Sequence, residues 1–265
     1  MLASRGIASL ALAYFKYEDL PKSFKTLELE YFEEAVKYLL SVPEVIGDKC
    51  GVIGTCLGGL MAILMGVYIK EVKSILTINT AAIAAGATVT LGGVPLNETI
   101  QLTTDSMTFD SKMRVKPVKE KWIEYLQTDN SRIIPVHKLD DDKNIIFVAG
   151  DNDSMFGHYS AKAFEKLMHD HNRSNMTSII YEGAGHMIEP PYGILIEHAY
   201  EVSSNPKGKV PPNYIMYWGG TAKGQCAAQE HLWIVIQEYF KSNITKDNDW
   251  SLMNLRQYEK LTSKL

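Results

Sequence analysis

The chain has 265 residues, a length that suits one large α/β domain or at most two domains. A chain of this length can bury a hydrophobic core without disulfide bonds or structural metal ions. Its 27 Lys and Arg nearly balance its 31 Asp and Glu, so the basic excess typical of a nucleic-acid binder is absent from the sequence. An apolar fraction of 46% excludes wholesale disorder, and three cysteines without CxxC spacing argue against a disulfide framework or a zinc site and favour a reducing compartment.

Two apolar stretches need to be distinguished from targeting and membrane segments. The first 15 residues resemble a short signal peptide, but their apolar part is brief and leads directly into charged residues, so we expect a buried strand over 6–13. Residues 51–69 are uncharged and long enough to cross a membrane. Their glycines cluster in the first half, which favours a strand, a tight turn and a buried helix, and so no membrane span.

Strand and helix periodicities alternate along the rest of the chain, as in an α/β fold with a mostly parallel sheet flanked by helices. In 27–41, Phe32, Val36 and Leu39 recur at helical spacing with acidic residues between them, which predicts an amphipathic helix. In 144–149 every residue after Asn144 is apolar, which is typical of a strand covered on both faces. The expected strands are 6–13, 51–55, 74–79, 144–149 and 177–181, and the expected helices are 27–41, 57–70, 158–171 and 226–241.

Two segments of mixed character, 84–138 and 192–224, interrupt this alternation, and we expect both to be loop-rich excursions. We therefore expect one domain over 1–244 and a polar tail over 245–265. The tail ends in Ser263, Lys264 and Leu265, and the tripeptide SKL at a C-terminus is read by the peroxisomal import receptor. This ending predicts a peroxisomal location, with the cytosol as the alternative.

The segment GTCLG, centred on Cys56, lies where the expected strand 51–55 meets the expected helix 57–70. It is the G-x-S-x-G nucleophile elbow with cysteine in place of serine, and Gly54 and Gly58 leave room for the strained turn. The positive end of the helix favours the thiolate of Cys56, and the backbone N–H of Leu57 is placed to stabilise an oxyanion. The alternative is a buried structural cysteine in a glycine turn.

An elbow needs an acid and a histidine later in the chain. Asp151 and Asp153 follow the expected strand 144–149, and either could orient a histidine at that carboxyl end of the sheet. His186 follows the strand 177–181 in a loop of small residues and is the candidate base. The other histidines fit surface or packing roles, with His231 on the last helix as a weak reserve.

These motifs resemble a known family, the C-terminal catalytic domain of acyl-CoA thioesterases and bile acid-CoA:amino acid N-acyltransferases. The resemblance extends to about residue 241, and the sequence GHMIEPPY after an elbow is its most specific part. The similar segments are 14–22, 27–45, 51–59, 147–153, 183–192 and 218–220. Dienelactone-hydrolase-like enzymes also carry a G-x-C-x-G-G elbow but lack the EPPY and WGG segments, so they are the lower-ranked alternative.

The resemblance implies an α/β-hydrolase fold with a catalytic triad, which falls here on Cys56, Asp153 and His186. It favours Asp153 over Asp151, because the family's acid matches the second acidic position after the glycine that ends the strand. It implies acyl-CoA as the substrate, with no cofactor and no metal. Members of the family are often peroxisomal, in agreement with the SKL ending.

The cysteine at the elbow helps to predict whether water or an amine accepts the acyl group. Thioesterases of the family usually carry serine there, whereas its amino acid N-acyltransferases typically carry cysteine. An acyl-cysteine is a thioester and reacts readily with amines such as glycine or taurine, so we expect an acyl-cysteine intermediate leading to transfer, to hydrolysis, or to both. His186 would move the protons. The competing interpretation is a non-catalytic, truncated paralogue that binds acyl-CoA.

The sequence departs from the family on its N-terminal side. Family members begin with a β-sandwich domain and the first strands of the sheet, and we expect no counterpart of either in this sequence. The third strand usually carries the loop with the second oxyanion donor, and it separates the strands that match 6–13 and 51–55. We therefore expect these two strands to pair directly or to leave a gap, and we expect a marginally stable, weakly active chain.

Overall fold

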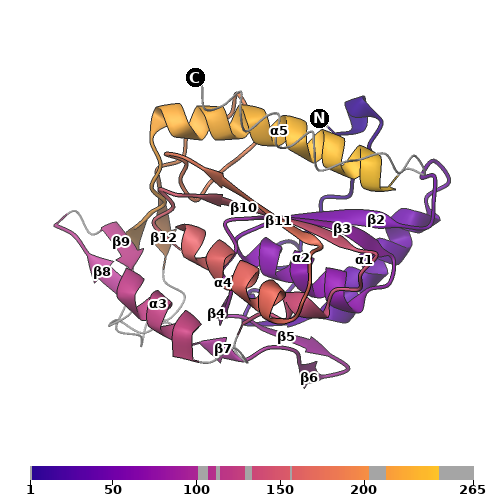
Figure 1. Ribbon diagram of the computed structural model, residues 1–265, viewed down its shortest axis with the longest axis horizontal. Coiled ribbons are helices and arrows are strands. Elements are labelled where there is room, and N and C mark those ends of the chain that lie inside the picture. The colour runs from indigo at the N-terminus through magenta and orange to yellow at the C-terminus, as the bar shows by residue number, and fades with distance from the viewer. Residues whose placement is uncertain are drawn as a thin grey trace.

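The computed structural model describes residues 2–100, 107–111, 114–128, 133–155, 157–202 and 213–244 (Figure 1). The expected tail, 245–265, with Ser263, Lys264 and Leu265, lies outside the described residues. At the centre is a parallel sheet of four strands in the order β11-β10-β3-β2. Its strands are β2 (Cys50–Thr55), β3 (Val72–Ile78), β10 (Asn144–Gly150) and β11 (Met176–Tyr181).

The two inner strands, β3 and β10, pair in register, with Ile75 opposite Ile145 and Ile78 opposite Val148. Their side chains are almost entirely buried on both faces, which explains the continuous apolar runs in the sequence. Because all four strands run parallel, their carboxyl ends meet at one edge of the sheet. The loops that follow β2, β10 and β11 therefore lie close together.

Helices cover both faces of the central sheet (Figure 1). One face packs with α1, α2 and α4 around side chains that include Phe32, Leu64, Phe147 and Phe164. The other face packs with the long α5 through Leu232 and Tyr239, among others. The helices are α1 (Leu29–Ser41), α2 (Leu57–Tyr68), α4 (Gly157–Asp170) and α5 (Ala222–Ile244). The sheet is thus sandwiched between helices, as the periodicity predicts.

The two expected loop-rich segments contain short strands and a helix. Three small sheets have the orders β1-β5-β6, β4-β7 and β12-β13-β9-β8. Their strands are β1 (Thr26–Glu28), β4 (Ala84–Ala85), β5 (Thr88–Leu91), β6 (Val94–Pro95), β7 (Thr99–Ile100), β8 (Met107–Phe109), β9 (Arg114–Pro117), β12 (His198–Val202) and β13 (Asn213–Tyr217). The remaining elements are the helix α3 (Lys119–Thr128) and the 3-10 turns η1 (Ala3–Arg5) and η4 (Val136–Lys138). Among the described residues, no helix has the length and apolar character to span a bilayer.

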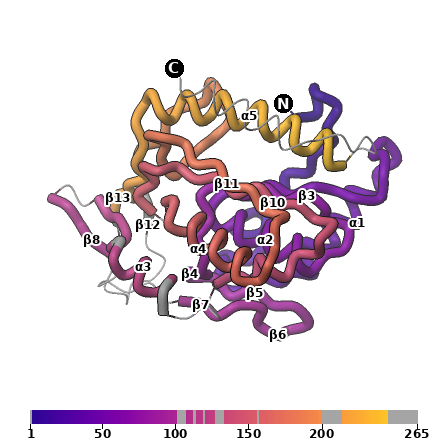
Figure 2. Tube along the Cα trace, in the orientation of Figure 1, coloured from indigo at the N-terminus to yellow at the C-terminus, as the bar shows by residue number. Residues whose placement is uncertain are grey.

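The expected strand over 6–13 is wrong. After η1 the chain runs on without strand pairing until β1, and Leu10 remains 41% exposed. Figure 2 shows the start of the chain beside α5, and Leu2 packs against the hydrophobic cluster to which α5 contributes. The segment neither pairs directly with β2 nor forms a strand across a gap, and within the described residues β2 is an edge strand with β3 as its neighbour. An apolar run becomes a strand only where a second strand satisfies its backbone groups.

Candidate active site

Cys56 lies at the junction of β2 and α2, where it forms the N-cap of the helix. Its backbone has φ 55° and ψ −116°, a conformation that residues with a side chain rarely adopt. Three hydrogen bonds hold this strained turn. The Cys56 N–H donates to the carbonyl of Ile78 at 2.9 Å, and the Cys56 carbonyl accepts from the N–H groups of Gly59 at 3.1 Å and Leu60 at 3.3 Å.

The small residues that the turn requires are Gly54 and Gly59, which differs in part from the expected pair of Gly54 and Gly58. A Cβ on Gly54 would overlap the backbone of Gly58, and a Cβ on Gly59 would overlap the buried side chain of Thr80. At Gly58 itself, a Cβ would meet the hydroxyl oxygen of Tyr14 at 3.9 Å, an ordinary contact. On the helix side of the turn, the position without room for a side chain is therefore Gly59, one residue after the second glycine of the motif.

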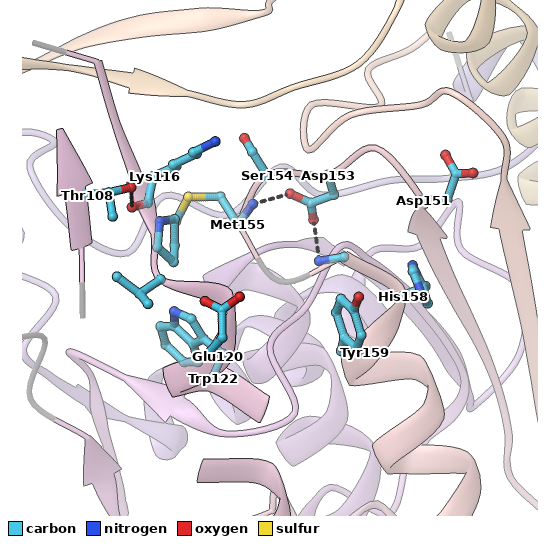
Figure 3. Close-up of a pocket in the computed structure, with 13 residues that line it drawn as sticks. Thr108, Lys116, Glu120, Trp122, Asp151, Asp153, Ser154, Met155, His158 and Tyr159 are labelled. Carbon is cyan, nitrogen blue, oxygen red and sulfur yellow. Dashed lines mark hydrogen bonds between the residues drawn. The ribbon is translucent and has the colours of Figure 1, made fainter. Parts of the chain in front are cut away.

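The structure brings Asp153 to His186. Asp153 Oδ2 lies 3.0 Å from His186 Nδ1, and the two side chains are 0% and 1% exposed. The carboxylate also accepts from the N–H groups of Met155 at 2.7 Å and Gly157 at 3.2 Å (Figure 3). Asp151 has a different partner, because its carboxylate accepts from the N–H of Gly183 at 2.6 Å. Asp153, and not Asp151, is the acid placed to orient the imidazole.

The electrostatics of His186 link all three side chains. Burial lowers the pKa of His186, but the charges of Asp153 and Cys56, together with the hydrogen bond to Asp153, outweigh burial and raise this pKa to about 10. The imidazole therefore holds a proton at neutral pH when the thiolate is present. A thiolate beside an imidazolium is the reactive form of a catalytic cysteine.

Trp218, in the WGG segment, joins the acid loop to the histidine loop. Its ring stacks on His186 with centroids 5.0 Å apart and an interplanar angle of 15°. Its carbonyl accepts from the N–H of His186 at 2.9 Å and from the N–H of Ser154 at 3.3 Å. Gly219 also forms a β-bridge with Asp153. The WGG segment thus fixes the position of both members of the His–Asp pair.

Asn79 is a second connection that the sequence reasoning missed. It directly follows β3, is 1% exposed and has φ 49°. Its Nδ2 donates to the carbonyls of Gly185 at 3.0 Å and His186 at 2.6 Å, and its Oδ1 accepts from the N–H of Gly150 at 2.8 Å. A polar residue at the carboxyl end of a buried strand is the signal that could have found it.

Leu57 is the first residue of α2, so its N–H is among those that have no intrahelical acceptor. Within the described residues no hydrogen bond uses it. It directly follows the thiol-bearing residue, at the position where an oxyanion donor is needed. The reserve histidine, His231, lies elsewhere and bonds the hydroxyl of Tyr181 at 2.7 Å, and burial lowers its pKa.

A cavity of about 380 Å³ lies on the side of Asp153 that faces α3 and α4 (Figure 3). Its lining includes Lys116, Trp122, Met155 and Tyr159, together with Asp153. In the described part of the chain, no three His, Cys, Asp or Glu side chains cluster in a way that could hold a metal ion.

A strained residue between strand and helix, an acid after a later strand and a histidine after the next strand make up the α/β-hydrolase arrangement. Comparison with known proteins gives a family match. The model of the family described as "BAAT / Acyl-CoA thioester hydrolase C terminal" matches residues 27–246.

Individual relatives point the same way. Acyl-coenzyme A amino acid N-acyltransferase 1 of Mus musculus is 36% identical over 251 residues, which cover 92% of this chain and 55% of the relative. Acyl-coenzyme A thioesterase 1 of Homo sapiens is 32% identical over 254 residues, which cover 92% of this chain and 56% of the relative. The chain thus spans about half the length of these curated relatives. Among solved structures, a dienelactone hydrolase-like phosphotriesterase from metagenomic libraries aligns with a TM-score of 0.41 at 12% identity, over 80% of this chain and 62% of that one.

Proposed function

The chain belongs to the BAAT / acyl-CoA thioester hydrolase C-terminal family, and from this premise we propose that it processes acyl-CoA thioesters through an acyl-cysteine on Cys56. The observation that carries the proposal is the placement of Cys56 at the N-terminus of α2, next to the buried His186–Asp153 pair. The His186 imidazole beside the sulfur can take the thiol proton when the sulfur attacks. A purely structural cysteine would require neither the strained backbone nor the charged neighbours.

The first step is acylation. The Cys56 thiol gives its proton to His186, and the thiolate sulfur attacks the carbonyl carbon of the acyl-CoA. As the new S–C bond forms, the carbonyl π electrons move to the oxygen, which accepts a hydrogen bond from the Leu57 N–H. The electrons then return, the bond from carbon to the CoA sulfur breaks, and the departing CoA thiolate takes the proton from His186.

The second step releases the acyl group. An amine or a water molecule attacks the acyl-cysteine carbonyl, and His186 accepts the proton that the nucleophile loses. The S–C bond breaks, and the Cys56 thiolate beside the protonated His186 is restored. Because the intermediate is a thioester, amines such as glycine or taurine are effective acceptors, and this chemistry favours transfer over hydrolysis. Asp153 holds the imidazole in the orientation that both steps need.

Product analysis tests the proposal. The full chain would be mixed with acyl-CoAs of several chain lengths, alone and with glycine or taurine, and the released CoA, free acid and N-acyl product would be separated by chromatography. We expect CoA release in every mixture with an accepted chain, and N-acyl product when the amine is present. Turnover that persists in Cys56→Ala would contradict the proposal. Cys226→Ala, which removes an exposed cysteine on α5, is the matched control and should behave like the unmodified chain.

A further inference from the structure

Tyr14 lies in the extended segment before β1, and its ring is held by aromatic packing. The ring centroid is 5.4 Å from that of Phe32 on α1 and 5.3 Å from that of Phe15. The hydroxyl end points to the first turn of α2, where it would lie 3.9 Å from a Cβ built on Gly58. Gly58 is two residues after Cys56, so a phenolic O–H lies over the same turn that presents the thiol and the Leu57 N–H.

The surroundings keep this hydroxyl protonated. Tyr14 is half-buried, and burial and then the nearby charge of Cys56 raise its pKa above the ordinary value of a phenol. The second cause places the phenol within electrostatic range of the sulfur. Within the described residues, no side chain or backbone group forms a hydrogen bond with the Tyr14 hydroxyl. It is a neutral donor whose hydrogen bond is not used inside the described fold.

We propose that the Tyr14 hydroxyl is a catalytic donor that completes the oxyanion hole together with the Leu57 N–H. The inference rests on the proposed acyl transfer to Cys56. When the Cys56 sulfur attacks the acyl carbonyl, the oxygen that gains the electron pair accepts one hydrogen bond from Leu57 and one from Tyr14. When the electrons return and the leaving group departs, both hydrogen bonds weaken, and Tyr14 keeps its proton throughout.

A donor of this kind acts selectively on the transition state. The carbonyl oxygen carries little charge in the bound substrate and nearly a full charge in the tetrahedral intermediate, so the hydrogen bond strengthens as the reaction proceeds. Loss of one oxyanion donor typically slows acyl transfer roughly 100-fold or more. A tyrosine that serves only to pack against Phe32 would show no such effect when its oxygen is removed, because the ring remains.

The test compares two reactions of the same sulfur in the full chain and in Tyr14→Phe. Acylation is followed as the burst of p-nitrophenolate from p-nitrophenyl butyrate and as acyl adduct formation from an acyl-CoA. Alkylation is followed with iodoacetamide, which reacts at a saturated carbon and develops no oxyanion. Tyr17→Phe, in the same segment with a 57% exposed side chain, is the matched control.

We expect Tyr14→Phe to slow acylation roughly 100-fold while alkylation of Cys56 stays within about twofold of the unmodified chain. An unchanged alkylation rate also shows that the elbow is correctly folded in the variant. If acylation is unchanged, or if acylation and alkylation slow together, Tyr14 is not an oxyanion donor. A burst from the ester but no adduct from acyl-CoA would refute the proposed substrate and still decide the role of Tyr14. If neither p-nitrophenyl butyrate nor the acyl-CoA acylates Cys56 in the unmodified chain, both proposals fail.

Discussion

The two ends of strand β2 carry the same side chain in opposite settings. Cys50 begins the strand at the amino edge of the sheet, is 6% exposed, and has its pKa raised to about 11 by burial and then by Glu71, against a smaller opposing effect of Lys49. Cys56 follows the other end of the strand, is half-buried and adjoins His186. Burial holds the first thiol protonated, while the second lies where a helix begins and an imidazolium is near.

The contrast shows that the edge of the sheet at which a cysteine lies, and not the residue type, determines which polar groups surround its thiol. The carboxyl edge collects the loops after β2, β10 and β11, and those loops supply Cys56, Asp153 and His186. At the amino edge, the Cys50 side chain packs into the hydrophobic core. Each of the following variants tests one part of this difference.

The largest effect is expected from removing each sulfur in turn. Cys56→Ala should abolish acyl-enzyme formation and lower the rate of CoA release at least about 10⁴-fold, because the attacking atom is gone. Cys50→Ala should keep the rate within about twofold. Chromatographic assay of free CoA measures both. Similar losses in the two variants would mean that the proposed distinction between the two ends of β2 does not exist.

Asp153→Asn should lower the rate of CoA release by about 10² to 10³-fold, since the imidazole loses its orienting charge. The pKa of His186 should fall with it, because the carboxylate no longer offsets the effect of burial. NMR titration of the His186 imidazole follows this change directly. Asp151→Asn, which alters the neighbouring carboxylate, should leave the titration as it is in the unmodified chain. A titration of His186 that is unaffected by Asp153→Asn would exclude this ion pair.

Asn79→Gly should lower kcat by about 10-fold with little change in KM, because the hydrogen bonds that tie the His186 loop to β10 are lost. Glycine accepts the positive φ of this position, so the backbone conformation is preserved. Asn172→Gly replaces an exposed asparagine with φ 54° and is the matched control. The pH profile of kcat should also shift in Asn79→Gly only. An unchanged kcat and pH profile would show that Asn79 has no positioning role.

The smallest effect should be on stability at the amino edge. Cys50→Ala should lower the free energy of unfolding by about 1 kcal/mol, as expected for a buried sulfur that only fills space. Urea denaturation measures this difference. In the native chain, iodoacetamide should modify Cys56 and the exposed Cys226 long before Cys50. Rapid modification of Cys50 under native conditions would contradict its burial.

Much of the fold could be predicted from the sequence because its signals are local. The segment 144–149 forms most of β10, as its apolar run predicts. Phe32, Val36 and Leu39 lie on α1, as their helical spacing predicts. The prediction failed at 6–13, where an equally apolar run forms no strand. Strand formation depends on a neighbouring strand, and the composition of a segment carries no information about its neighbours.

The same limit applies to the site. Cys56 was singled out by a pattern within five residues, and Asp153 and His186 were singled out by their positions after buried strands. Asn79 also follows a buried strand and Trp218 lies in a family-like segment, but their hydrogen bonds join backbone groups far away in the chain, and no local spacing encodes those contacts. Gly59 is likewise required because of a distant neighbour, since a Cβ there would overlap Thr80 in the loop after β3.

The most direct measurement is peptide mapping by mass spectrometry of the full chain, quenched with acid shortly after it is mixed with an acyl-CoA. We expect an added acyl mass on the peptide containing Cys56, and none on the peptides containing Cys50 or Cys226. Steady CoA release with an unmodified Cys56, or an acyl group on another residue, would contradict it.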